Sequence, residues 1–113
     1  MPEHTHETDK RRHEITREIA GLGYCLPGSV SARYLRCGNP RCRCQEHPDN
    51  RHGPYTYWTR KEHGRTIARL LSTEQTARYQ PQIDNARRLR QLVTALEALA
   101  IHAAEDAETW GRK

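Results

Sequence analysis

Cysteine and histidine residues are concentrated in the stretch 37–52, which reads CGNPRCRCQEHPDNRH. Cys37, Cys42 and Cys44 have the spacing C-x4-C-x-C, and two histidines follow them. Thiolate and imidazole are the ligands that zinc prefers, and a structural zinc site has four of them in a tetrahedral arrangement. A loop rich in Gly, Pro, Asn and Arg has little apolar material to fold around, and bound zinc can supply the missing folding free energy. We therefore predict a zinc (Zn2+) site in this loop.

Three thiolates leave one position of the tetrahedron to fill. We predict that His52 takes it, because the Gly-Pro pair directly after it can turn the chain out of the site into a strand. His47, Cys25 and a site with no fourth protein ligand are the alternatives. Disulfides are a different interpretation, since four cysteines allow three pairings, but one pairing joins Cys42 to Cys44 across a single residue. Reduced thiols without metal are the third interpretation.

Motifs on both sides of the cysteines resemble a family of small uncharacterised bacterial proteins. The residues that carry the resemblance are LPGSVS at 26–31, Arg33-Tyr34, Cys37-Gly38 with the C-x4-C-x-C spacing, and HGPY at 52–55. The resemblance covers roughly residues 26–100. It implies a bacterial or mobile-element setting and a metal site, and it implies no established activity. The run YTYWTRKEHGRTIARLL also looks like the arm-binding domain of some phage-type integrases, which is an analogy of pattern and says little about function.

The composition points to a small domain with a thin apolar core. The chain has 113 residues, 35% hydrophobic residues and no Phe, so a metal ion that supports the fold would be valuable. The first residues hold no apolar run, and no stretch approaches the roughly 18 apolar residues of a membrane span, so we expect neither a signal peptide nor a membrane segment. The expected compartment is the reducing cytoplasm, where clustered cysteines bind metal more often than they form disulfides.

The pattern along the chain predicts an α+β fold. Ile15, Ile19 and Leu22 lie on one face of a helix that the following glycines end. Strand-forming residues at 55–61 and 65–71 surround Glu62-His63-Gly64, which is typical of a hairpin. We expect a zinc-stapled antiparallel hairpin or three-stranded sheet with a short N-terminal and a long C-terminal helix. The expected bounds are a disordered tail 1–7, a single domain 8–104 (helix 8–23, metal loop and basic sheet 29–71, helix 73–104) and a polar tail 105–113.

The positive charge is concentrated in the middle of the chain. Residues 29–72 contain nine Lys or Arg against three Asp or Glu, a net charge of +6, whereas the whole chain carries +5. Such a localised field favours a polyanionic partner, most simply nucleic acid. We favour DNA over RNA, and the alternative is a solvated surface that balances the thiolates. The predicted nucleic-acid-binding residues are Tyr55, Tyr57, Arg60, Lys61, Arg65 and Arg69.

The C-terminal helix carries a leucine stripe. Ser72 or Thr73 is its expected N-cap, and Pro81 is expected to kink or split it. Leucines with 3-4-3 spacing, at 89, 92, 96 and 99, predict a face that covers the sheet or pairs with a second helix. A homodimer or an interaction adaptor is therefore the alternative function. We expect no enzyme, because three Cys and one His would close the coordination sphere that a catalytic zinc keeps open.

Overall fold

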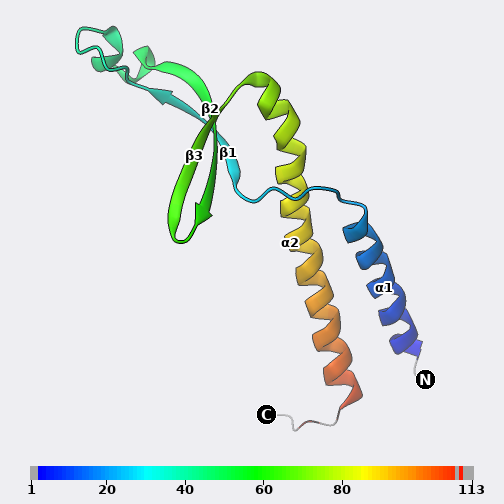
Figure 1. Ribbon diagram of the computed structural model, residues 1–113. Helices are drawn as coiled ribbons and strands as arrows, with labels where there is room; N and C mark the ends of the chain where they lie inside the picture. Colours follow the sequence, from blue (N-terminus) through cyan, green and yellow to red (C-terminus); the bar gives the residue numbers. More distant parts are fainter. Residues whose placement is uncertain (1–2, 109, 111–113) are drawn as a thin grey trace. The chain divides into compact units, whose positions relative to one another are not determined.

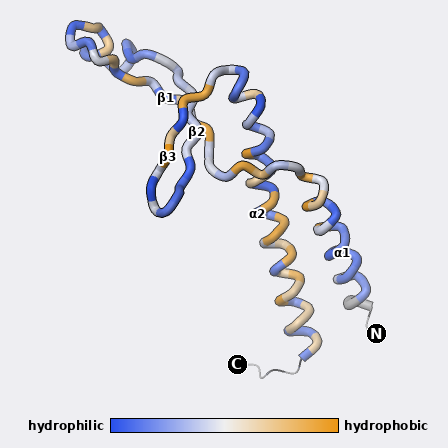
Figure 2. Tube along the Cα trace, in the orientation of Figure 1, coloured by the Kyte–Doolittle hydropathy of each residue, from blue (hydrophilic) through white to orange (hydrophobic). Residues whose placement is uncertain are grey.

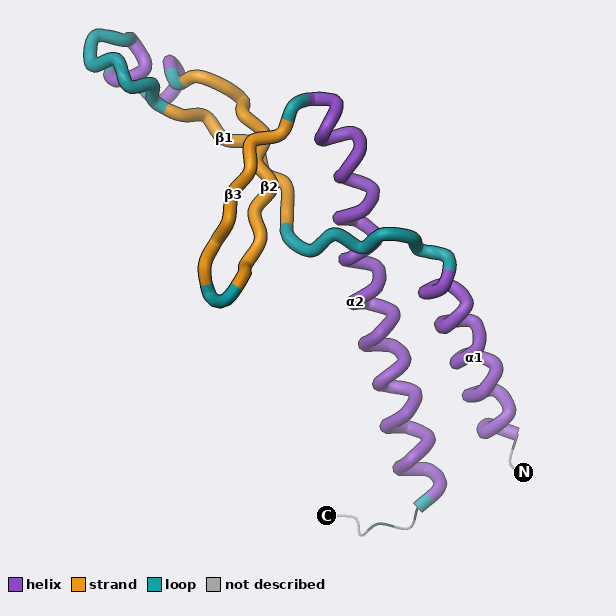
Figure 3. The backbone as a smooth tube through the Cα atoms, viewed as in Figure 1, coloured by secondary structure: helices purple, strands orange, loops and turns teal. Residues whose placement is uncertain are grey.

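The computed structural model describes residues 3–108 and 110 (Figures 1 and 3). It confirms the predicted α+β class, with the sheet in its three-stranded form. The elements are α1 (Glu3–Ala20), β1 (Ser29–Leu35), β2 (His52–Glu62), β3 (Arg65–Leu71) and α2 (Thr73–Ala107), with two short 3-10 turns between β1 and β2. No helix within the described residues is both long enough and apolar enough to cross a bilayer.

The described residues divide into two compact units. The first, which we call the helical unit, contains α1 and the part of α2 from Asp84 onward. The second, the sheet unit, is Leu26–Ile83 and holds the three strands with the loop between β1 and β2. A single domain over 8–104 stays a prediction.

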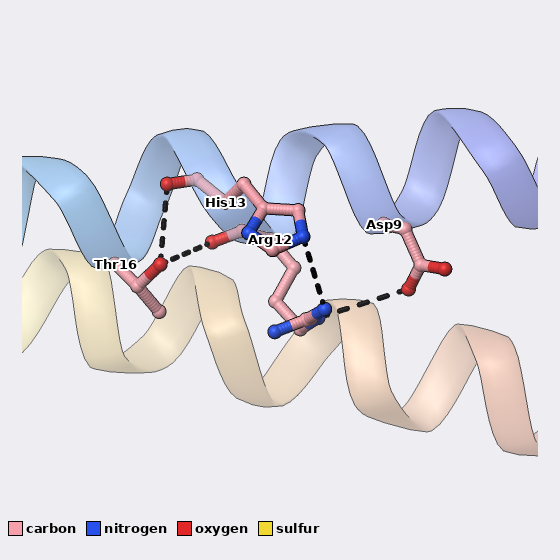
Figure 4. Close-up of polar contacts among 4 residues, drawn as sticks. All are labelled: Asp9, Arg12, His13 and Thr16. Atoms are coloured by element: carbon pink, nitrogen blue, oxygen red, sulfur yellow. Dashed lines mark hydrogen bonds and ion pairs between the residues drawn. The ribbon is translucent and has the colours of Figure 1, made fainter.

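Helix α1 begins earlier than the sequence pattern predicts, at Glu3, inside the segment expected as a polar tail. Residues 1 and 2 lie outside the described part of the chain. Local polar contacts hold this helix (Figure 4): Arg12 pairs with Asp9 at 3.7 Å and lies 3.3 Å from His13 Nε2. Thr16 Oγ1 donates to the carbonyls of Arg12 and His13, each at 3.1 Å. These contacts join residues inside the predicted helix 8–23, so they stabilise α1 locally but do not account for its earlier start.

In the helical unit, α1 and α2 run antiparallel (Figure 1). Asn85 Nδ2 donates to the carbonyl oxygens of Leu22 at 2.7 Å and Tyr24 at 3.1 Å. Arg88 donates two hydrogen bonds to the Glu18 carboxylate, at 2.6 and 3.0 Å. Figure 2 shows that α1 is largely hydrophilic, whereas α2 carries more hydrophobic residues. The buried apolar residues of this unit are few. They are Ile15, Ala86 and Leu92.

The sheet has the order β1-β2-β3 with both pairs antiparallel. Residues paired across strands share a face, so the register divides the side chains into two sets. One set, the tryptophan face, contains Trp58, Arg60, Arg65, Ile67, Arg69 and Leu71. The other, the tyrosine face, contains Arg33, Tyr55, Tyr57, Lys61 and Leu70.

The LPGS motif anchors the start of β1 on the tryptophan face. Trp58 Nε1 donates to the Pro27 carbonyl at 2.9 Å. Gly28 has φ +114°, and a Cβ there would lie 2.3 Å from the Thr59 carbonyl oxygen and 2.6 Å from Trp58 Nε1. Only glycine tolerates both the conformation and the close approach, so this part of the motif has a structural role.

Helix α2 begins with a capping box. Ser72 Oγ accepts from the Gln75 N–H at 3.0 Å, and Gln75 Oε1 accepts from the Ser72 N–H at 2.8 Å. Of the two predicted caps, Ser72 is therefore the one used. The helix continues through Pro81 and reaches Ala107, so the expected split at Pro81 does not occur. Proline removes one intrahelical donor, and a helix this long keeps its remaining hydrogen bonds.

Candidate metal centre and basic sheet

The paired ends of β1 and β2 bring two of the predicted ligands together. Leu35, the last residue of β1, pairs with His52, the first residue of β2. Cys37 therefore follows directly beyond the pair, and the whole loop 36–51 lies at one end of the sheet, away from the hairpin turn at 63–64 (Figure 1). A Cβ on Gly53, where φ is +134°, would lie 2.7 Å from the Arg33 carbonyl oxygen. Glycine after His52 thus lets β2 begin at the metal loop, as predicted for the Gly-Pro pair.

Hydrogen bonds within the loop position the other two cysteines. The Cys42 N–H donates to the Asn39 carbonyl at 3.1 Å, which turns the chain back toward β1. The 3-10 turn Arg43–Gln45 carries Cys44, which is buried. Gln45 Nε2 then donates to the Cys37 carbonyl at 2.8 Å and ties this turn to the strand end. The loop is ordered by polar contacts around sulfur atoms rather than by an apolar core.

The ligand atoms of Cys37, Cys42, Cys44 and His52 all lie within 4.8 Å of one another. Cys37 Sγ and Cys44 Sγ are 3.6 Å apart, and Cys42 Sγ lies 3.3 Å from His52 Nε2. A tetrahedron with metal–sulfur bonds of about 2.3 Å has edges of about 3.8 Å. The four side chains therefore fit a single metal ion of this size and could hold one.

The cysteines of the described chain are free thiols. A sulfur–sulfur distance of 3.6 Å between Cys37 and Cys44 is far longer than the roughly 2.05 Å of a disulfide bond. The group of neighbouring ligand atoms does not include His47 or Cys25. Of the fourth ligands considered, the geometry therefore selects His52.

The arrangement perturbs the acidity of two thiols in opposite directions. The Cys44 backbone N–H and the His52 side chain lower the pKa of Cys42 to about 6, so this thiol loses its proton easily. The Cys37 N–H donates to Cys44 Sγ at 3.3 Å and by itself favours the thiolate. Burial and the two neighbouring thiols outweigh it, so that the pKa of Cys44 is raised. Crowded thiols of this kind are typical of a site for a cation, because metal ligation requires thiolates and a bound cation stabilises them.

The six predicted nucleic-acid-binding residues do not share one surface. Tyr55, Tyr57 and Lys61 lie on the tyrosine face, whereas Arg60, Arg65 and Arg69 lie on the tryptophan face. Arg60 is engaged within the sheet, because its guanidinium lies 4.7 Å from the centre of the Trp58 ring and pairs with Glu62 at 3.2 Å.

The sequence reasoning missed several neighbours of the tyrosine side chains. Arg33 lies over the Tyr57 ring at 5.0 Å, and Leu35, Arg36 and Leu70 line the same hollow as Tyr55. The alternation in β1 places Arg33 and Leu35 on one face, but only the strand register shows that Tyr55 and Leu70 share that face.

Fold and site together define a small α+β protein with a Cys3His group able to hold a metal ion. The chain belongs to the family described as "Domain of unknown function (DUF6788)", whose model matches residues 5–80. The match includes α1, which the resemblance over residues 26–100 did not reach, and ends inside α2. Comparison with the curated proteins and with the solved structures gives no match.

Proposed function

We propose that this protein is a zinc-binding module whose basic sheet binds nucleic acid, DNA in preference to RNA. The observation that supports this proposal best is a concentration of cationic side chains without acidic partners. In residues 29–72, all of which the structure describes, the one ion pair is that of Arg60 with Glu62. The remaining Lys and Arg side chains of this segment surround the metal group and the sheet.

Zinc suits the Cys3His donor set better than hard cations, which prefer oxygen ligands. When bound, it supplies folding free energy and fixes the loop that continues into β1 and β2. Three thiolates on Zn2+ leave the site at −1, so segment 29–72 keeps a net charge of about +5 for a partner. Four protein ligands close the coordination sphere, so we propose no catalytic role for the metal. We also propose a setting in the cytoplasm. A mobile element or phage is a candidate source.

The tyrosine face is the better contact surface of the two. It presents Arg33 and Lys61 on the same face as the exposed Tyr55 and the half-buried Tyr57, and the one acid of the hairpin, Glu62, lies on the other face. On the tryptophan face, Arg69 borders a separate hollow with Trp58 and Tyr79, close to the start of α2. Each Lys or Arg that contacts a phosphate releases condensed counterions, so affinity should fall steeply with added salt.

The test is a fluorescence polarisation titration of zinc-loaded protein with DNA and RNA oligonucleotides at several salt concentrations. We expect Arg33→Ala with Lys61→Ala to weaken binding and to lower the slope of log K against log salt by about one to two. The matched variant is Arg65→Ala with Arg69→Ala, which removes two cations of the same hairpin from the opposite face. Unchanged zinc content and thermal midpoint are the controls.

A larger loss in the Arg65 and Arg69 variant would move the contact surface to the tryptophan face. If both variants keep the affinity and the salt slope of the wild type, the arginines of the metal loop would become the contact surface. Absence of binding to any nucleic acid at low salt would show that the proposed function is wrong.

The alternative function is an interaction adaptor that self-associates through the seam from Leu89 to Leu99. The favouring observation is that α2 exposes apolar side chains next to this seam, at Val93 and Ile101. Val93→Asp with Ile101→Asp would then convert a dimer to a monomer in sedimentation without loss of helicity. A wild-type chain that sediments as a monomer would exclude the homodimer.

A further inference from the structure

The tyrosine face exposes apolar side chains that no other element covers within the sheet unit. Leu70 is 58% exposed, and Leu35 and Tyr55 are each 38% exposed. All three border one hollow of about 220 Å3. An open sheet face with this much apolar surface is typical of a binding surface rather than of a solvated one.

The hollow borders the metal group. Besides Leu35, Tyr55, Tyr57 and Leu70, it is lined by Arg36 and by two members of the metal group, Cys37 and His52. A bound metal would fix the last residue of β1 and the first residue of β2 at this point, which would limit the movement of the neighbouring side chains. Preorganised apolar surfaces of this kind lower the entropy cost of binding.

Cations lie beside the hollow and farther along the same face of the sheet. Arg33 lies over one side of the Tyr57 ring at 5.0 Å, Arg36 lines the hollow, and Lys61 extends from the same face toward the hairpin turn. The three acids of segment 29–72 are Glu62, which pairs with Arg60 on the opposite face, and Glu46 and Asp49 in the metal loop. The surface therefore suits a ligand that combines flat apolar groups with repeated negative charge.

We propose that the tyrosine face binds single-stranded nucleic acid. Bases would stack on Tyr55 and pack against Leu70. The phosphates would be bound by the cations of this face, Arg33, Arg36 and Lys61. This inference rests on the proposed function and narrows its ligand. A duplex hides its base faces in the stack and offers phosphates and groove edges to a protein. A single strand exposes its base faces, and stacking on an aromatic side chain tolerates every base. The exposed Tyr55 and Leu70 would add little to duplex binding and much to single-strand binding.

The experiment compares zinc-loaded protein on three labelled ligands of the same length and sequence: single-stranded DNA, single-stranded RNA and duplex DNA. We expect either single strand to bind at least about tenfold more tightly than the duplex. Tyr55→Ala should weaken single-strand binding by about 5- to 100-fold with no change in salt slope. Tyr55→Phe, which keeps the ring, should restore the affinity. Arg69→Ala on the opposite face is the matched control and should leave the preference for single strands unchanged.

The comparison of the three ligands tests this inference separately from the proposed function. Duplex binding as tight as single-strand binding, with no effect of Tyr55→Ala, would overturn the inference and leave nucleic-acid binding standing. Binding of neither single strand nor duplex would overturn both. Tighter binding of single-stranded DNA than of single-stranded RNA, or the reverse, would support the inference and show which sugar the protein prefers.

Discussion

The helical unit and the metal loop stabilise their folds in different ways. In the helical unit, Ile15, Ala86 and Leu92 are the buried apolar residues. Arg88 joins α2 to Glu18 of α1, and Asn85 joins α2 to the segment that follows α1. In the metal loop, Cys44 is the one buried hydrophobic residue. Its order comes from four side chains whose ligand atoms lie within 4.8 Å of one another.

The difference follows from composition. A chain with 35% hydrophobic residues and no Phe cannot build two apolar cores. Helices bury their few apolar residues economically, because positions three and four apart share one face. A loop has no such repeat, so it needs a ligand set that acts at a single point. Each region should therefore respond to its own kind of damage.

The largest effect is expected from Cys44→Ser. Structural zinc contributes on the order of 10 kcal/mol or more to folding in small zinc proteins, and Cys44 is the most buried ligand of the group. We expect the zinc content to fall from one ion per chain toward zero and the loop to become sensitive to protease, while the helical signal in circular dichroism persists.

Cys25→Ser is the matched control, because Cys25 lies outside the metal group. It should keep full zinc content in elemental analysis of protein purified without chelator. If wild-type protein contains no metal, or if Cys44→Ser binds zinc as Cys25→Ser does, the four residues are not a zinc site.

Leu92→Asp with Leu96→Asp should damage the other region. Leu92 is buried, and placing a carboxylate there costs at least about 3 kcal/mol. We expect loss of helicity in circular dichroism with zinc still bound. Val93→Asp in the same turn, where the side chain is exposed, is the control. A folded double variant with the wild-type sedimentation mass would mean that this stripe is neither core nor interface.

Ser72→Ala should have a moderate effect. It removes one half of the capping box at the start of α2, which is worth about 1 kcal/mol. Urea unfolding measures the change, and Thr73→Ala is the adjacent control. Equal losses in the two variants would contradict the assignment of Ser72 as the cap.

The smallest effect is expected from Glu18→Gln. The hydrogen bonds from Arg88 lower the pKa of Glu18 below its ordinary value of 4.5. A lowered carboxyl pKa contributes stability that is present above the ordinary value and is lost as the pH falls through the folded-state pKa. The thermal midpoints of wild type and variant should therefore differ slightly at neutral pH and converge below 4.5. Glu14→Gln, on the same helix, is the control for the substitution itself. A difference between wild type and Glu18→Gln that stays constant at all pH values would contradict the ion pair.

Much of the site could be predicted from the sequence, because ligand chemistry depends on residue type. Thiol and imidazole side chains at C-x4-C-x-C spacing, with a histidine before Gly-Pro, indicate a metal group wherever the loop lies in space. The fold class followed in the same way from local signals: alternation in the strands, a turn at Glu62-His63-Gly64 and a capping residue before α2.

Two features depended on the tertiary structure. The strand register, which no local pattern specifies, divided the six predicted contact residues between two faces and put Arg33, Leu35 and Leu70 beside Tyr55. The sequence favoured His52 over His47 as the fourth ligand, but the closeness of His52 to the three cysteines depended on the pairing of Leu35 with His52, since a cross-strand pair brings together residues that are distant along the chain.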